Sequence, residues 1–343
     1  MIALGPQPTF GDYIAHWLAT YVSRLPGATT RDGYARAMRL YWLPALRDKP
    51  LDGIRASEIQ AVIDGLQGRG LKPSTVKTAF LVLSGAMTRA RADRLIDYNP
   101  TEAIRAPRQI ARTCRWLTQG EAVRFIEAAL VPDGMGSHYW YGSILAAAVM
   151  TGMRMGELRG LRWENVELWG EDAREGDSTA GNIHVCEQIY SGLKSATWSP
   201  PKSASSTRDV PVLPDLARLL LIHRERVLRH AKRKGTREWQ DFNLVFPNQV
   251  GGPATPEVVQ KTRVAVAALV GIEPAPTMNA LRHTYASLLV DGGVPPHVVA
   301  KLLGHADVRL TVNVYYEATP VAREAAALAL GGILGRREFG RGG

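Results

Sequence analysis

Apolar residues recur at helical spacing through the first third of the chain. Tyr13, Trp17 and Tyr21 follow one another at four-residue intervals, which indicates an amphipathic helix that begins near Thr9. The same spacing, interrupted by glycine and proline, predicts three further helices over residues 31–43, 52–66 and 74–92. Residues 1–105 are therefore expected to form a compact helical domain.

The pattern restarts at Thr118. This residue and Glu121 form a capping box, so a helix is expected to begin there. A largely apolar helix is predicted over residues 139–151, and short strands joined by a polar loop over 183–189 and 209–213. Helices return from Leu216 to the end, with breaks at the glycine and proline clusters near 247–256, 271–276 and 292–296. The fold class is mainly α with a small antiparallel β-sheet, and the second domain covers residues 118–343.

Residues 106–117 form a predicted linker between the two domains. Pro107 breaks the helical pattern, and four arginines lie in or beside the linker, at Arg105, Arg108, Arg112 and Arg115. A cationic connector is suited to follow a DNA phosphate backbone, whereas the alternative is a solvated tether. Both interpretations stay open at this point.

The charge balance favours a polyanionic partner. The chain has 42 Lys and Arg against 32 Asp and Glu, a net charge of +10. Residues 1–114 hold 16 basic and 9 acidic side chains, which gives +7, and the remainder holds 26 and 23, which gives +3. Double-stranded DNA is the expected partner, and a basic surface that serves only solubility is the alternative.

The cysteines, the start of the chain and the histidines narrow the possible functions further. Cys114 and Cys186 are the two cysteines, so a disulfide framework is not expected. The start of the chain lacks the pattern of a signal peptide, and no apolar run is long enough to span a bilayer. The eight histidines show no ligand spacing with cysteine or carboxylate. We expect a cytoplasmic, nucleoid-associated protein with no metal or other cofactor and no membrane partner.

Two distant segments supply complementary chemistry. Arg154 lies between glycines in residues 151–163, while Arg282, His305 and the pair Tyr315 and Tyr316 lie in residues 281–316. Two guanidinium groups, an imidazole and a phenol suffice for phosphoryl transfer onto tyrosine, because the guanidinium groups replace the usual magnesium beside the charged transition state.

Residues 9 to about 320 resemble a tyrosine recombinase of the bacteriophage-integrase type. The resemblance in the first domain depends on short motifs at 9–13, 43–46, 73–76 and 99–100, and in the second on the segments around Arg154, Arg282, His305 and Tyr315. It implies a helical core-binding domain and an α+β catalytic domain that form a clamp around DNA. It also implies a 3′-phosphotyrosyl intermediate, double-stranded attachment sites, a tetramer on DNA and a possible accessory DNA-bending or directionality factor.

The resemblance assigns roles to individual residues. Arg154 and Arg282 match the two catalytic arginines, and Glu157 would orient Arg154. His305 matches a histidine that contacts the scissile phosphate. Lys202 matches the family's lysine that protonates the departing 5′ oxygen, and Lys194 is the alternative. The nucleophile matches Tyr315, with Tyr316 as the rival. His283 is expected to be a structural histidine bonded to backbone.

One position departs from the family pattern. The family usually has histidine three residues before the second arginine, and this chain has Asn279. Asparagine donates a hydrogen bond but cannot accept a proton as a base at neutral pH. Proton removal from the phenol would then fall to water, His305 or DNA, or the enzyme would be slower than its relatives.

The biological role has several candidates. Integration or excision of a phage or mobile element is favoured, with a short attachment site because the first domain begins almost at residue 9. A Xer-type resolvase, a type IB topoisomerase and a catalytically impaired site-specific DNA-binding protein are the alternatives. A final helix over 321–330 would dock on an adjacent protomer or on its own domain.

Overall fold

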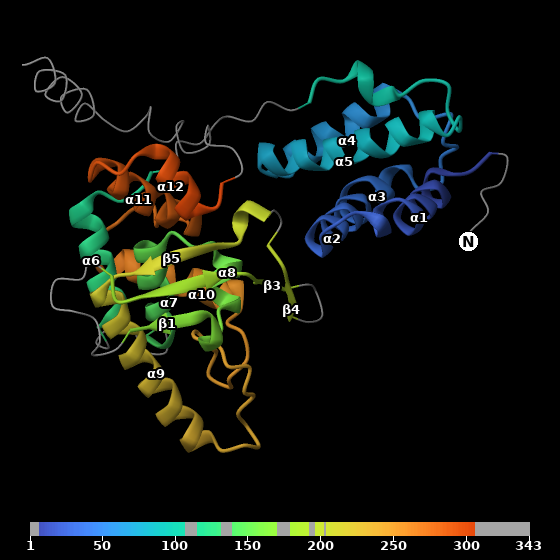
Figure 1. The fold of residues 1–343 in the computed structure, drawn as a ribbon. Helices are drawn as coiled ribbons and strands as arrows, with labels where there is room; N and C mark the ends of the chain where they lie inside the picture. Colours follow the sequence, from blue (N-terminus) through green and yellow to red (C-terminus); the bar gives the residue numbers. More distant parts are fainter. Residues whose placement is uncertain are drawn as a thin grey trace, which may run out of the picture. The chain divides into compact units, whose positions relative to one another are not determined.

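The computed structural model describes residues 7–106, 115–131, 139–169, 179–191, 196–201 and 204–305. The chain divides into two compact units, Met1–Thr113 and Cys114–Gly343, and each is described by itself (Figure 1). The prediction of a mainly helical chain with small antiparallel sheets is confirmed. The predicted domain limits stay predictions, since most of the basic linker, including Arg108 and Arg112, lies outside the described residues.

The first unit is a bundle of helices around one apolar core. Its helices are α1 (Phe10–Thr20), α2 (Ala28–Ala37), α3 (Leu43–Leu46), α4 (Ala56–Gly68) and α5 (Pro73–Ala92), with 3₁₀ turns at Val22–Arg24 and Pro100–Ala103. The helix predicted over 31–43 is instead α2, a π turn at Met38–Trp42 and then α3. Pro44 explains the break, because it has no N–H to continue the α-helical hydrogen-bond ladder.

Two buried aromatic side chains tie this bundle to α5. The Tyr13 hydroxyl donates to the Ala86 carbonyl at 2.6 Å, and the Trp42 Nε1–H donates to the Ala79 carbonyl at 3.0 Å. Large aromatic groups bury much apolar area, and each of these also satisfies its polar atom inside the core. The first unit is thus held by a core that is independent of the second.

The second unit surrounds the apolar helix α7. Its helices are α6 (Gln119–Leu130), α7 (Tyr139–Thr151), α8 (Met155–Gly160), α9 (Pro214–Lys234), α10 (Pro256–Leu269), α11 (Met278–Asp291) and α12 (Pro296–Leu303). The predicted capping box of Thr118 and Glu121 begins α6. Helices α6, α10 and α11 pack on α7 (Figure 1), and its small side chains, including Ala146, Ala147 and Ala148, let them approach closely.

Two small antiparallel sheets complete this unit. Strands β1 (Val166–Leu168), β2 (Gly181–Val185) and β5 (Arg208–Val212) form one sheet in the order β1-β2-β5, and β3 (Gln188–Ser191) pairs with β4 (Ala196–Ser199). The single strand predicted over 183–189 was wrong: the chain leaves the first sheet after β2, and β3 packs against α8. Strands β1 and β4 were not predicted. Within the described ranges, no helix combines the length and apolar character needed to cross a membrane.

The core of the second unit contains a neutral histidine. His223 on α9 contacts the Val245 carbonyl oxygen through Nε2 at 2.9 Å, and Arg226 donates to its Nδ1 at 2.7 Å. Burial, and then the charge of Arg226, lowers the pKa of His223 to about 3. The unfolded chain therefore binds a proton at this residue at a higher pH than the folded chain does.

This difference predicts an acid-sensitive stability. Because the folded pKa is depressed, the loss of stability begins as the pH falls through about 6.5, and by pH 5 it should reach about 2 kcal/mol from His223 alone. His223→Gln keeps a donor and an acceptor but does not titrate. Urea unfolding at pH 7 and pH 5 should show a fall in stability that is smaller by this amount in the variant, and equal falls in both proteins would contradict the assignment.

Candidate active site

Arg154 stands immediately before α8, in a turn that glycine permits. Gly152 has a φ of +62°, and a Cβ there would lie 2.4 Å from Cδ1 of Tyr285. Glu157, one turn into α8, accepts from the backbone N–H of Arg154 at 2.8 Å and from its Nη1 at 2.9 Å. The carboxylate therefore caps the helix and orients the guanidinium group at the same time.

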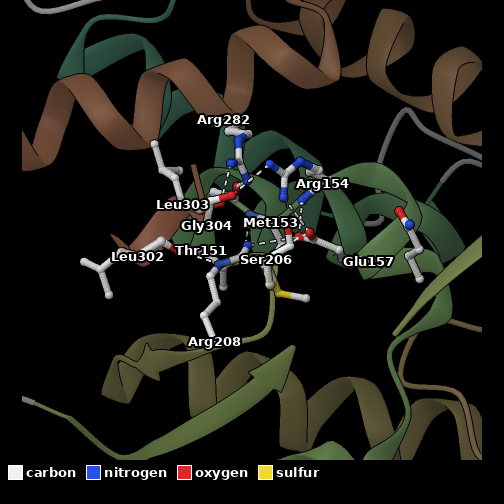
Figure 2. A network of polar contacts seen from close by, with 12 residues as sticks. Thr151, Met153, Arg154, Glu157, Ser206, Arg208, Arg282, Leu302, Leu303 and Gly304 are labelled. Atoms are coloured by element: carbon white, nitrogen blue, oxygen red, sulfur yellow. Dashed lines mark hydrogen bonds and ion pairs between the residues drawn. The ribbon is translucent and has the colours of Figure 1, made fainter. Parts of the chain in front are cut away.

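Glu157 also pairs with a second arginine, Arg208 at the start of β5. The Arg208 Nη1 and Nη2 donate to the two carboxylate oxygens at 3.2 and 2.9 Å. Glu157 is 2% exposed and the Arg208 side chain 4%. Burial raises the pKa of Glu157, but the hydrogen bonds and charge of Arg208, with the bonds from Arg154, outweigh burial and leave the pKa below its ordinary value. Glu157 is thus the buried anion between two arginines, as Figure 2 shows.

Arg282 reaches the same place from α11. Its Nη1 donates to the Gly152 carbonyl at 2.7 Å, and its Nη2 donates to the Leu303 carbonyl. Burial, and then the charge of Arg154, lowers the pKa of Arg282 to about 9, so the group stays protonated at neutral pH. Arg282 is 5% exposed, whereas the Arg154 side chain is 37% exposed. Arg154 is therefore the more accessible of these two cations.

The C-terminal end of α12 joins the three arginines. The Leu302 carbonyl accepts from Arg208 Nε at 2.6 Å, the Leu303 carbonyl from Arg282, and the Gly304 carbonyl from Arg154 Nη2 at 3.2 Å (Figure 2). The last carbonyls of a helix lack partners within it and carry partial negative charge, so they suit cations. Three consecutive carbonyls each accept from a different arginine.

His305 follows directly after these carbonyls. Its pKa is lowered to about 4 by burial, then by Arg282 and Arg154, and by His283 among the remaining charges. The imidazole is therefore neutral at pH 7, with one nitrogen that donates and one that accepts. His283 is half-buried, and burial, followed by the charge of Arg282, lowers its pKa. The expected role of His283 as a histidine bonded to backbone stays a prediction.

The remaining candidates lie in several places. Asn279 is exposed on the first turn of α11, one turn before Arg282. Arg105 is exposed in the first unit, and Arg115 is exposed in the second, where it pairs with Glu121 and donates to the Glu273 carbonyl at 3.2 Å. The other candidates, Lys194, Lys202, Tyr315 and Tyr316, lie outside the described residues.

Arg208 is the residue that sequence reasoning missed. The motif around Lys202 was recognised, but Arg208 was given no role, and the predicted strand began at the next residue, Asp209. A signal was present, because Arg208, Val210 and Val212 alternate with outward residues, and all three are buried along β5. An arginine whose side chain lies on the buried face of a strand requires an anionic or carbonyl partner.

Two family models match this chain. The phage integrase family matches residues 205–321, and the N-terminal SAM-like domain of phage integrases matches residues 9–67. The chain belongs to the phage integrase family of tyrosine recombinases. The matched ranges include Arg208, Asn279, Arg282, His305 and Tyr315. The predicted resemblance and the predicted function, a site-specific DNA recombinase, are confirmed.

Two relatives are similar to this recombinase over most of its length. A tyrosine recombinase XerC-like protein of Caldanaerobacter subterraneus subsp. tengcongensis is 25% identical over 326 residues, which are 91% of this chain and 80% of the relative. An integrase of Streptomyces ambofaciens is 25% identical over 339 residues, which are 98% and 83%. Both relatives therefore align with most of this recombinase.

Solved structures share the fold of this recombinase. The Tn1549 transposon integrase in complex with a circular intermediate DNA has a TM-score of 0.73 at 20% identity, and the match covers 94% of this chain and 99% of that chain. A lambda integrase dimer bound to a COC′ core site has a TM-score of 0.61 at 19% identity, with 89% and 95% covered. The recombinase fold is thus confirmed.

In the part of the chain that the structure describes, no group of three or more His, Cys, Asp and Glu side chains could hold a metal ion. The positive groups that converge here include the guanidinium groups of Arg154, Arg208 and Arg282.

The buried position of Glu157 predicts a large loss on neutralisation. Glu157→Gln should destabilise the second unit by about 3 to 5 kcal/mol, because the guanidinium group of Arg208 would keep a buried charge without an anion. Urea unfolding measures this loss.

A matched control is available in α6. Glu121 occupies the same third position of its helix and also pairs with an arginine, but the pair is more exposed, at 14% for Glu121 and 50% for Arg115. Glu121→Gln should cost less than about 1 kcal/mol. Equal losses in the two variants would show that burial does not set the strength of the Glu157 cluster.

Proposed function

We propose that this recombinase cleaves and rejoins DNA through a covalent 3′-phosphotyrosyl bond formed by Tyr315. The observation that supports the proposal is the convergence of Arg154, Arg282 and His305 at the end of α12, with His305 ten residues before Tyr315. A phosphodiester in its transition state gathers negative charge on its non-bridging oxygens, and fixed cations stabilise that charge. The cluster is an anion site of this kind.

The strand exchange then proceeds in two steps, cleavage and rejoining. The phenolic oxygen of Tyr315 attacks phosphorus and loses its proton, while the bond from phosphorus to the 5′ oxygen breaks and Lys202 supplies a proton to that oxygen. Arg154 and Arg282 donate to the non-bridging oxygens throughout. A 5′ hydroxyl of the partner duplex reverses the reaction, so the phosphotyrosyl bond conserves the energy of the broken linkage.

Asn279 leaves the first proton transfer without the usual histidine. A neutral His305 has an acceptor nitrogen, and burial and the nearby arginines keep its pKa near 4 before DNA arrives. His305 therefore serves as a hydrogen-bonding partner that does not add a charge to the cluster. In this chain, the phenol proton therefore passes to water or to the DNA itself.

The finer biological role is integration or excision of a phage or mobile element. The integrase of Streptomyces ambofaciens aligns with 98% of this chain, and the Tn1549 transposon integrase has the same fold. The recombinase would close around double-stranded DNA as a clamp and assemble as a tetramer, as lambda integrase does in a structure bound to a Holliday junction. The exposed Arg105 and Arg115 would contact the phosphate backbone. Such a reaction occurs at the nucleoid in the cytoplasm.

The nucleophile is tested with a nicked suicide duplex. Tyr315→Phe should form no covalent protein–DNA adduct on a denaturing gel, since the phenolic oxygen is the only atom removed, and it should bind DNA as the wild type does. Tyr316→Phe, the neighbouring control, should form the adduct. An adduct with Tyr315→Phe would refute the assignment, and no adduct with the wild type would leave a DNA-binding protein without catalysis.

The Asn279 departure has a separate test. Asn279→His should raise the single-turnover rate of adduct formation by about tenfold, a fraction of the roughly 100-fold or more that a positioned general base contributes. Asn279→Gln is the control and should not raise the rate. If Asn279→His cleaved at the wild-type rate, a base at this position would not be what the chain lacks.

A further inference from the structure

Arg208 is bound on all sides by groups of the protein itself. Its Nε donates to the Leu302 carbonyl at 2.6 Å and its Nη1 to the Ser206 carbonyl at 3.0 Å. Its Nη1 and Nη2 also form a fork on the two oxygens of Glu157, at 3.2 and 2.9 Å. These bonds occupy four of the five N–H groups of a guanidinium group. Arg208 therefore donates its hydrogen bonds to groups of the protein and is not placed to bind a DNA phosphate.

The partners of Arg208 are the groups that position the other two arginines. Glu157 holds the backbone N–H and the Nη1 of Arg154. Leu302 immediately precedes the carbonyls of Leu303 and Gly304 that receive Arg282 and Arg154. Arg208 thus connects α8 with the end of α12, which are separate in sequence and are both required for the anion site.

The backbone around Arg208 is fitted to this connection. Gly304 has a φ of +65°, and a Cβ there would lie 3.0 Å from the Ser205 carbonyl oxygen and 3.2 Å from Cδ of Arg208. The glycine lets the turn after α12 lie against the residues that precede β5. Arg208 is consequently enclosed between the turn, the strand and Glu157.

We propose that Arg208 is a positioning residue for DNA cleavage, which locks Glu157 and the end of α12 together so that Arg154 and Arg282 hold a fixed spacing toward the scissile phosphate. The inference rests on the proposed function of those two arginines. A fork of two parallel hydrogen bonds fixes direction as well as distance, and a lysine ammonium at this site keeps the charge without the fork. Arg208→Lys therefore separates geometry from charge.

The main experiment compares Arg208→Lys with a matched buried arginine. Counted as whole residues, Arg263 on α10 and Arg208 are each 8% exposed, and the Arg263 Nη1 donates to the Pro276 carbonyl at 2.5 Å. Melting temperature, affinity for a duplex recombination site and the single-turnover rate of adduct formation at saturating DNA are measured for both lysine variants. Both variants should lose thermal stability, because each lysine replaces a buried, hydrogen-bonded guanidinium group.

The cleavage rate should separate the two variants. Arg208→Lys should cleave about 10- to 100-fold more slowly, because a displacement of about 1 Å at a reacting centre can cost roughly 100-fold. Its duplex affinity should stay within about threefold, since many phosphate contacts share the affinity. Arg263→Lys should cleave at close to the wild-type rate. An unchanged rate in Arg208→Lys, or an equal loss in Arg263→Lys, would overturn the inference and leave the proposed function intact.

A double-mutant cycle tests whether Arg208 acts through Arg154. The rate loss of Arg154→Lys combined with Arg208→Lys should be smaller than the product of the two single losses, because groups that act as one unit are not additive. Losses that multiply would show that Arg208 acts independently of Arg154, contrary to the proposal.

A phosphate titration gives a readout that does not require cleavage. Inorganic phosphate is added to each full-length protein, and binding is followed by the NMR shift of the His305 ring. Arg208→Lys should weaken phosphate binding several-fold, and Arg263→Lys should leave it unchanged. If the wild type formed no adduct, the proposed function would fail, and this titration would still decide the inference: equal phosphate affinities would overturn it.

Discussion

The mutual repulsion of three clustered guanidinium groups is the constraint on which the catalytic unit depends. Arg154, Arg208 and Arg282 converge on a region whose buried carboxylate is Glu157. One carboxylate offsets one charge, so other groups must stabilise the remainder. The end of α12 supplies this stabilisation, because its unpaired carbonyls and its dipole both favour cations. The site is therefore assembled, and still positive, before any DNA arrives.

The same constraint explains the local backbone. Carbonyls that accept from the three arginines lie at the ends of α7 and α12, and both ends must come close to other parts of the chain. Gly152 and Gly304 permit this approach at the ends of α7 and α12, each with a positive φ that suits glycine. The carbonyls of both glycines are themselves acceptors, for Arg282 and Arg154. Turn geometry and electrostatics are thus satisfied by the same residues.

The sequence predicted the helices and the family far better than the contacts within the site. Helical spacing and the capping box at Thr118 are local signals, and α5 and α6 agree with them closely. The strands were harder, since residues 183–189 alternate as one strand although β3 leaves the sheet to pack on α8. Glu157 could be paired with Arg154 from their spacing of three. Its second partner could not, because Arg208 is 51 residues away and is brought near by the fold.

Backbone acceptors were beyond sequence reasoning for a similar reason. Every residue has a carbonyl, so nothing in the letters of residues 302–304 distinguishes these three from others. Their role arises only when α12 ends beside α8 and α11. By contrast, the side chains that have particular chemistry, such as Arg154 and Arg282, could be named in advance. The sequence therefore indicated the reactive side chains, but not the backbone carbonyls that orient them.

The electrostatics of this cluster also clarify why asparagine is compatible with position 279. Both His283 and His305 already have lowered pKa values from burial and from Arg282, so each is kept from adding a positive charge. A histidine one turn before Arg282 would face the same field, whereas an amide has no proton to lose or gain. Asn279 therefore adds no titratable group beside Arg282. In the proposed reaction, what it gives up is an acceptor for the phenol proton, so a group other than residue 279 must activate the nucleophile.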